Sequence, residues 1–193
     1  MCNLYYLCDM KATKERLIEA AVIALNNDES ATIEHIANQA DVTRRTVHRY
    51  FNDRNTLVQE CKQTMLRVCN HSMITAYRSS QQPLVQLENM FYAALDVGIQ
   101  YSFVKKMARR QQYTDLLNNQ EQAYDDVKIN WFKLVEQLQQ QGAINPKLSI
   151  PWIYNLFGGM VDIAIEAHQA GDVARNDIKS FSWTSFKGSI GLQ

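Results

Sequence analysis

Apolar residues recur at spacings of three and four along almost the whole chain, which is the period of an α-helix. The first stripe lies in residues 11–27 and includes Leu17, Ile18, Ala21 and Leu25. No stretch alternates apolar and polar residues in the sustained manner of a β-strand, and only 7 Gly and 3 Pro occur among 193 residues. The pattern therefore predicts an all-α fold.

Polar breaks divide this pattern into separate helices. Thr32, Thr43 and Asp53 each precede a helical stretch, as N-cap residues do. Glycine and proline mark turns farther along the chain. Besides a short helix that begins after Thr32, we expect helices over residues 11–27, 44–51, 54–78, 84–98, 101–112, 119–141, 151–170 and 177–190.

These helices predict two units joined by one long helix. A three-helix head lies near residues 10–52, and a larger helical body starts at about residue 83. We place the domain boundary after residue 70, so that the N-terminal domain is 10–70 and the C-terminal domain is 71–193. Residues 1–9 fit neither unit, and we expect them to be a frayed arm.

Composition narrows the functional classes. The 20 basic and 20 acidic residues cancel, so no overall charge indicates a nucleic-acid or membrane partner. The sequence has no C-x-x-C, H-E-x-x-H, G-x-G-x-x-G or G-K-[S/T] motif. We therefore expect that the protein is not an enzyme and that it has no catalytic residues, no metal site and no cofactor. The four cysteines, without an export signal or a membrane-spanning run, indicate free thiols in a cytoplasmic protein.

Residues 32–51 carry the most informative pattern. Two short helices are joined there by a tight turn, with Val42 in the angle between them and Ala37 small enough to allow close approach. Ile36 and Val47 would complete a small core. This is helix-turn-helix geometry, in which the second helix can enter a DNA major groove.

Positive charge is concentrated on that second helix. Residues 44–54 contain four arginines and one acid, whereas residues 1–62 together have eight basic and nine acidic residues. A solvated helix face usually mixes both signs, so this concentration favours a surface that faces phosphates. Thr43, Thr46, His48 and Tyr50 add hydroxyl and ring groups that suit phosphates or base edges.

The same residues resemble the TetR family of one-component bacterial repressors. Ile36-Ala37-x-x-Ala40-Asp41-Val42-Thr43 and then Thr46-Val47-x-x-Tyr50-Phe51-x-Asp53-Arg54-x-x-Leu57 follow the family's form, I-A-x-x-A-G-V-S-x-x-T-[LV]-Y-x-[HY]-F-x-[SN]-K-x-x-L. The resemblance implies a homodimeric repressor that binds a palindromic operator on double-stranded DNA. It implies pairing through the last two long helices and release by a small molecule bound in the C-terminal domain. With the charge pattern, it gives these DNA-binding candidates: Thr32, Thr43, Arg44, Arg45, Thr46, His48, Arg49, Tyr50 and Arg54.

Three positions depart from the family form. Asp41 stands where Gly is usual at a left-handed turn, a conformation that Asp tolerates. Arg45 stands where a small residue is common, and His48 replaces a frequent Tyr. These changes keep the motif but alter the surface that would read the operator. We expect Arg44, Arg45 and Thr46, in the first turn of the second helix, to reach bases. The resemblance implies phosphate contacts for Tyr50 and Arg54.

The body offers candidates for an effector pocket. Aromatic residues are abundant there, and they suit an apolar or aromatic ligand, although the ordinary alternative for each is helical core. Asn155, Gly159, Asp162 and Glu166 form a narrow polar stripe that favours a packing face in a dimer; alternatively, Asp162 or Glu166 points into a cavity. The pocket candidates are Tyr92, Tyr101, Tyr113, Tyr124, Trp131, Asn155 and Asp162.

Two other classes of function stay open. The chain could be an architectural or cofactor-type DNA-binding protein on the same fold that lacks ligand control. An enzyme built on a helical bundle is disfavoured, because no nucleophile–base pair or metal-spaced cluster occurs.

Overall fold

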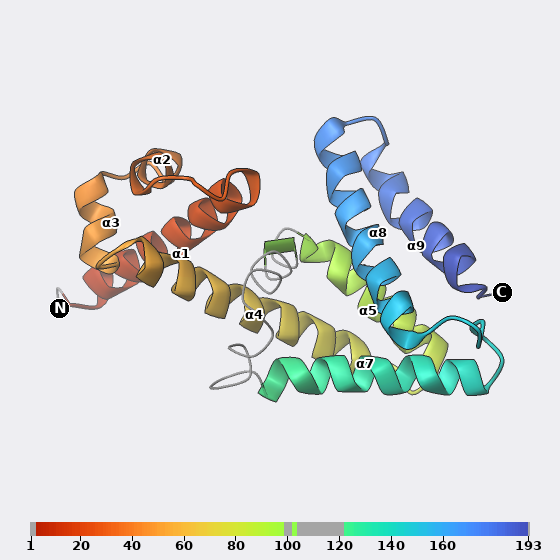
Figure 1. Ribbon diagram of the computed structural model, residues 1–193. Helices are drawn as coiled ribbons and strands as arrows, with labels where there is room; N and C mark the ends of the chain where they lie inside the picture. Colours follow the sequence, from red (N-terminus) through yellow and green to blue (C-terminus); the bar gives the residue numbers. More distant parts are fainter. Residues whose placement is uncertain (1–2, 99–101, 104–121, 193) are drawn as a thin grey trace.

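The computed structural model describes residues 3–98, 102–103 and 122–192, and this part of the chain is helical without a strand (Figure 1). The predicted all-α fold is confirmed. The helices are α1 (Asn3–Asn27), α2 (Ile33–Gln39), α3 (Arg44–Tyr50), α4 (Arg54–Arg78), α5 (Pro83–Asp96), α7 (Gln122–Gln140), α8 (Ile150–Ala170) and α9 (Arg175–Ile190). In Figure 1, α1 to α3 form the head at the N-terminal end, and α4 leads from the head to the body formed by α5, α7, α8 and α9.

The predicted helix starts in the head are confirmed at three caps. Thr32 Oγ1 accepts a hydrogen bond from the backbone N–H of His35 at 3.1 Å. Asp53 Oδ1 accepts from the N–H of Thr56 at 2.7 Å, and this bond lowers the pKa of the Asp53 carboxyl. Thr43 caps α3 in the same way. Each cap satisfies an N–H that the first helical turn leaves without a partner.

The first helix begins earlier than the pattern predicts. We expected it to start near residue 11 after an arm of nine residues, but α1 begins at Asn3. Residues 3–10 contain no Gly or Pro, so nothing in this segment interrupts a helix that is already formed at residue 11.

Two hydrophobic cores hold the molecule together. The head core includes Leu17, Ile36, Val47 and Phe51, all with 1% exposure or less. The body core centres on Phe91, whose ring lies 5.1 Å from the stacked ring of Phe186 and also contacts the following rings: Tyr92, Phe157 and Trp183. These side chains come from α5, α8 and α9, so one aromatic cluster fixes three helices of the body.

The turn between α2 and α3 depends on one left-handed residue. Asp41 has a φ of 53°, and among the described residues it is the one non-glycine with a positive φ. Val42 N–H donates to the Ala37 carbonyl at 3.0 Å and closes the turn. The helix-turn-helix therefore forms as predicted, with Asp accepting a conformation that glycine adopts more readily.

None of the described helices has the length and apolar character needed to cross a bilayer.

Replacing Asp41 tests the strain in this turn. Asp41→Gly should raise the free energy of unfolding by about 0.5–1 kcal/mol, because glycine adopts a positive φ without a steric cost. Asp41→Val should lower it, since a β-branched side chain clashes in that region. Urea denaturation followed by circular dichroism measures both variants. A Gly variant less stable than the parent protein would show that the Asp41 side chain contributes more than its backbone strain costs.

Candidate DNA-binding surface and effector cleft

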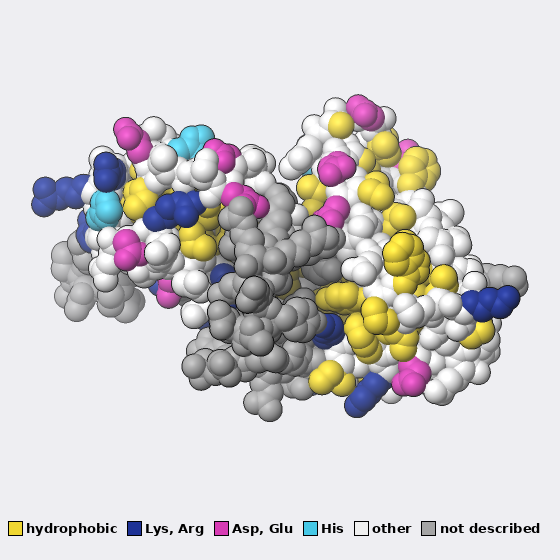
Figure 2. Space-filling model, viewed as in Figure 1, with side chains coloured by type: hydrophobic (Ala, Val, Ile, Leu, Met, Phe, Trp, Pro, Cys, Tyr) yellow, Lys and Arg dark blue, Asp and Glu magenta, His cyan; other side chains and the backbone are white. Residues whose placement is uncertain are grey.

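Helix α3 presents a basic, exposed surface. Val47 is its one buried residue, whereas Arg44, Arg45, His48 and Arg49 are exposed. Figure 2 shows dark blue Lys and Arg side chains and a cyan histidine together at the outer end of the head, where α3 lies in Figure 1. A short helix anchored by one apolar side chain and otherwise exposed can enter a groove.

The arginines of α3 differ in how they are held. Arg44 Nε donates to His48 Nε2 at 3.5 Å, one helical turn away. Arg49 lies 5.1 Å from the centre of the Tyr50 ring and donates to its hydroxyl at 3.4 Å. Arg45 is exposed and has no hydrogen bond or ion pair within the described structure. The guanidinium of Arg45 is thus the one on α3 that is available to a ligand without first breaking a contact.

Three of the candidate hydroxyl groups also maintain the local fold. Thr43 Oγ1 accepts from the Thr46 N–H at 3.1 Å and lies 3.0 Å from Thr46 Oγ1. Thr32 caps α2 and is exposed. Their remaining hydrogen-bonding capacity faces solvent at the starts of α2 and α3, where the helix dipoles also favour an anion such as phosphate.

Arg54 is oriented differently from the other candidates. Its guanidinium is half-buried and points back to the loop between α1 and α2. Nε donates to the Ala31 carbonyl at 3.1 Å, and Nη2 donates to the Glu29 carbonyl at 2.5 Å. The phosphate contact expected from the sequence would need this side chain to leave both carbonyls. The geometry instead gives Arg54 a role inside the head.

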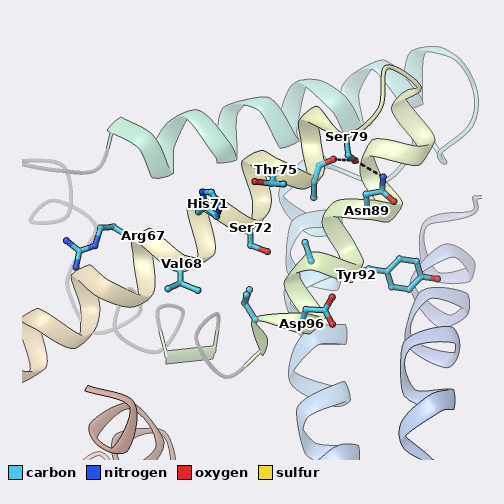
Figure 3. Close-up of a pocket in the computed structure, with 12 residues that line it drawn as sticks. Arg67, Val68, His71, Ser72, Thr75, Ser79, Asn89, Tyr92 and Asp96 are labelled. Atoms are coloured by element: carbon cyan, nitrogen blue, oxygen red, sulfur yellow. Dashed lines mark hydrogen bonds between the residues drawn. The ribbon is translucent and has the colours of Figure 1, made fainter. Parts of the chain in front are cut away.

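A cleft of about 790 Å³ lies between α4 and α5 in the body. In Figure 3, polar side chains line one end of it, where Asn89 Nδ2 donates to Ser79 Oγ at 2.8 Å, and Arg67 lies at the other end. The lining residues are Arg67, Val68, His71, Ser72, Thr75, Ala76, Ser79, Asn89, Tyr92, Ala93, Asp96 and Val97. The α4 residues were not among the pocket candidates, because their small polar side chains resemble an ordinary solvated helix face.

The predicted pocket residues do not gather in one place. Tyr92 borders the cleft, but in Figure 3 its ring points away from α4, and the ring lies 6.1 Å from that of Trp183. Burial and then the nearby Glu88 carboxylate raise the pKa of its hydroxyl. Trp131 is buried in the body core, with its ring 5.2 Å from that of Tyr154. Asn155 and Asp162 lie on α8 and do not line the cleft. Three candidates fall outside what the structure describes: Tyr101, Tyr113 and the side chain of Tyr124.

The outer surface of α8 and α9 is unusually apolar. Trp152, Ile163 and Phe181 are large hydrophobic side chains with 56%, 54% and 57% of their surface exposed. Figure 2 shows yellow hydrophobic side chains over this part of the body. The polar stripe predicted on α8 is at this surface as well, with Asn155 and Glu166 exposed. Large apolar groups that gather on one exposed face mark a surface for association.

Comparison with known proteins agrees with the geometry of the head. The sequence model of the family described as bacterial regulatory proteins, tetR family, matches residues 17–61. This match covers the C-terminal part of α1, all of α2 and α3, and the start of α4. The helix-turn-helix head matches the TetR family.

Relatives extend the likeness over more than nine tenths of the chain. It is 25% identical over 178 residues to the HTH-type transcriptional repressor LfrR of Mycolicibacterium smegmatis, covering 92% of this chain and 90% of that protein. The structure of LfrR in complex with proflavine matches with a TM-score of 0.66 at 23% identity, covering 93% and 97% of the two chains. The ketosteroid regulator KstR2 of Mycobacterium tuberculosis matches with a TM-score of 0.71 at 15% identity, covering 93% and 95%.

The family match of the head and the LfrR relative indicate a transcriptional regulator, with a helix-turn-helix head and an all-α body. In the part of the chain that the structure describes, no group of three or more His, Cys, Asp or Glu side chains could hold a metal ion. The relatives named above are transcriptional regulators, which is a non-enzymatic class.

Two cysteines of the chain lie on α4, where they pack into the head core. Burial raises the pKa of the Cys61 and Cys69 thiols to about 12. A thiol whose pKa rises from 9.0 to about 12 contains about a thousandfold less thiolate at pH 8, and the thiolate is the reactive form. Neither thiol is therefore suited to sensing oxidants.

The rate of alkylation should show how strongly burial protects the Cys61 and Cys69 thiols. At pH 8 iodoacetamide should modify Cys61 and Cys69 in the native protein at least about a hundredfold more slowly than in 6 M guanidinium chloride, because burial suppresses the thiolate. Raising the pH toward 10 should still leave both mainly protonated, since the folded-state pKa values are about 12. Peptide mass spectrometry assigns the modified residue. Rapid labelling of either cysteine in the native state would contradict the buried position.

Proposed function

We propose that this protein is a homodimeric repressor that binds a palindromic operator and leaves it when a small molecule binds the body. The observation that carries this proposal is the basic, exposed surface of α3, with Arg45 unpaired in its first turn. In helix-turn-helix docking the N-terminal residues of the second helix approach the base edges. Arg44, Arg45 and Thr46 occupy that turn, and Arg45 is free to form a bidentate contact with guanine.

The remaining candidates would anchor the head to the DNA backbone. Thr32 and Thr43 lie at the starts of α2 and α3, where exposed hydroxyl groups and helix dipoles favour phosphate. His48, Arg49 and Tyr50 follow along α3. Phosphate contacts of this kind fix the register of the helix in the groove but carry no sequence information themselves.

We propose that two copies associate through α8 and α9. The exposed Trp152, Ile163 and Phe181 would be covered in that arrangement, and α8 and α9 from each copy would form a four-helix interface. A two-fold axis between the copies would present two α3 helices to successive major grooves, about 34–36 Å apart. Palindromic operators have this symmetry.

The effector is proposed to bind in the cleft between α4 and α5. Its apolar lining residues are Val68, Ala76, Ala93 and Val97, which suit an apolar part of a ligand. The structure of the relative LfrR in complex with proflavine supports the proposal that this chain also binds a small molecule. Helix α4 forms one wall of the cleft and begins in the head. A ligand that binds more tightly to one tilt of α4 therefore shifts the population of dimers that can bind DNA.

Selection of bound sequences from a random duplex pool tests the proposed operator. The proposal predicts enrichment of an inverted repeat whose half-sites are separated by about one helical turn. A ligand-independent architectural protein on the same fold would enrich a site but show no release by any compound of an apolar or aromatic library. Failure to enrich any sequence would contradict operator recognition.

Arg45→Ala separates base reading from general attraction to DNA. We expect the change to weaken binding to the selected operator by about 1–3 kcal/mol per half-site, because it removes a bidentate Arg–guanine contact. The base preference at one position of the half-site should also relax. Binding to random duplex should change much less. Fluorescence anisotropy with both duplexes measures the two affinities.

Arg78→Ala is the matched control, because Arg78 is an exposed arginine at the far end of α4. It should leave the ratio of specific to random affinity unchanged. An unchanged ratio in Arg45→Ala would exclude Arg45 as a base reader and leave Arg44 and Thr46 as the candidates.

Charged replacements on α8 and α9 test the dimer. Ile163→Asp and Phe181→Glu should each produce monomers in sedimentation velocity, since a buried unpaired carboxylate is strongly unfavourable in an apolar interface. Removing residues 177–193 would be a poorer test, because Trp183 and Phe186 belong to the body core. Lys147→Glu, at a position outside α8 and α9, is the control. A dimer that persists in both interface variants would place the interface elsewhere.

A further inference from the structure

The recognition helix has few direct attachments to the rest of the protein. Helix α3 packs mainly against α2, and α2 packs mainly against α1 and α3. Covalently, α3 reaches α4 through residues 51–53, of which Asn52 and Asp53 are exposed. Because a three-residue linker can act as a hinge, the linker alone would not force α3 to follow α4.

Arg54 supplies a second attachment at the other end of the helix-turn-helix. As the first residue of α4, it donates through Nε and Nη2 to the carbonyls of Ala31 and Glu29, 23 and 25 residues earlier in the chain. Ala31 directly precedes Thr32, the cap of α2. The segment before α2 and the segment after α3 are thus joined at one side chain.

The loop that receives Arg54 is itself ordered by local contacts. Asp28 accepts hydrogen bonds from the backbone N–H of Ser30 at 2.8 Å and from its hydroxyl at 2.7 Å. These bonds lower the pKa of the Asp28 carboxyl, with smaller contributions from the neighbouring His35 and Arg54 side chains. Ala31 is 4% exposed and belongs to the head core. The two carbonyls are therefore fixed acceptors at the base of α2.

We infer that Arg54 is a positioning residue that makes the helix-turn-helix and the first turn of α4 move as one body. By joining both ends of the helix-turn-helix to α4, it prevents α3 from rotating about residues 51–53 when α4 tilts. The inference rests on the proposed DNA-binding function and adds the means by which a movement of α4 reaches the recognition helix. It also replaces the phosphate contact expected for Arg54.

The shape of the arginine side chain explains why a positive charge alone would not make the double attachment to the two carbonyls. Nε and Nη2 lie on one edge of a planar guanidinium, so that they can donate in parallel to two carbonyls. Lysine, which is typical of this position in the family form of the motif, presents one compact ammonium without this planar pair of donors. Lysine at position 54 would keep the positive charge but lose the double attachment.

Three variants distinguish the attachment from a phosphate contact. The full chain is prepared as Arg54→Lys, Arg54→Ala and the control Arg78→Ala, and each is checked by circular dichroism to be folded at 20 °C. Binding to the duplex selected by the parent protein and to a random duplex of equal length is measured across a salt series. Hydrogen exchange at the amides of residues 29–36 is followed in the same proteins without DNA.

We expect Arg54→Lys and Arg54→Ala to lose a similar amount of specific affinity, about tenfold, while random binding changes little. The slope of log affinity against log salt should stay that of the parent protein. Exchange at residues 29–36 should become faster in both, and Arg78→Ala should match the parent in every measurement. A role limited to stability would lower the melting temperature and leave the specific-to-random ratio of the folded protein unchanged.

Other results would overturn the inference. Full retention of specific affinity in Arg54→Lys would mean that positive charge is sufficient. A salt slope reduced by about one unit per subunit in Arg54→Ala, and restored in Arg54→Lys, would identify a phosphate contact. If the parent protein bound no DNA, the proposed function would fail, and exchange at residues 29–36 would still decide the attachment: faster exchange supports it, and unchanged exchange excludes it.

Discussion

One helix, α4, is built into both hydrophobic cores. Leu57, Cys61 and Cys69 are buried in the head core, and Met73 and Ala76 in the body core. The buried positions 57, 61, 65, 69 and 73 repeat every four residues. At about 100° per residue this stripe turns by roughly 160° over sixteen residues, so the inward face of α4 rotates gradually from the head core to the body core. Neither unit can reposition α4 without disturbing the packing of the other.

Because α4 belongs to both cores, a ligand in the effector cleft can act on the head through this helix. The cleft-lining residues of α4 begin at Arg67 and end at Ala76, and the C-cap Ser79 follows. This segment includes the part of α4 that packs in the body core. With 25 residues α4 is roughly 37 Å long at about 1.5 Å per residue, so a small tilt at the body end becomes a displacement of several ångströms at the head. Packing from α1 holds the head end, where Lys14 and Glu60 form an ion pair at 2.8 Å.

Much of this arrangement could be predicted from the sequence because it depends on local rules. Thr32, Thr43 and Asp53 are caps by virtue of their own side chains, and Asp41 marks the turn through its tolerance of a positive φ. The exposed arginines of α3 follow from helical periodicity around Val47. Charge and period together therefore located the candidate DNA-binding surface.

The features that could not be predicted from the sequence depend mainly on contacts between residues far apart in the chain. Arg54 lies in a basic run, and only the folded chain brings it to the carbonyls of Glu29 and Ala31. Trp131 was grouped with pocket candidates because a buried core aromatic and a cavity-lining aromatic have the same helical spacing. The start of α1 was misplaced for a local reason, since residues 3–10 lack both a break and a strong amphipathic pattern.

The spacing dependence of operator binding tests the account most directly. Each base pair inserted between two half-sites separates them by about 3.4 Å and rotates one against the other by roughly 35°. Heads held by α4 in a two-fold dimer predict one sharp optimum near 34–36 Å between half-site centres, with a steep loss of affinity one or two base pairs away. Affinity that stays constant across these spacings would show independently moving heads, and would contradict a dimer that positions its recognition helices through α4.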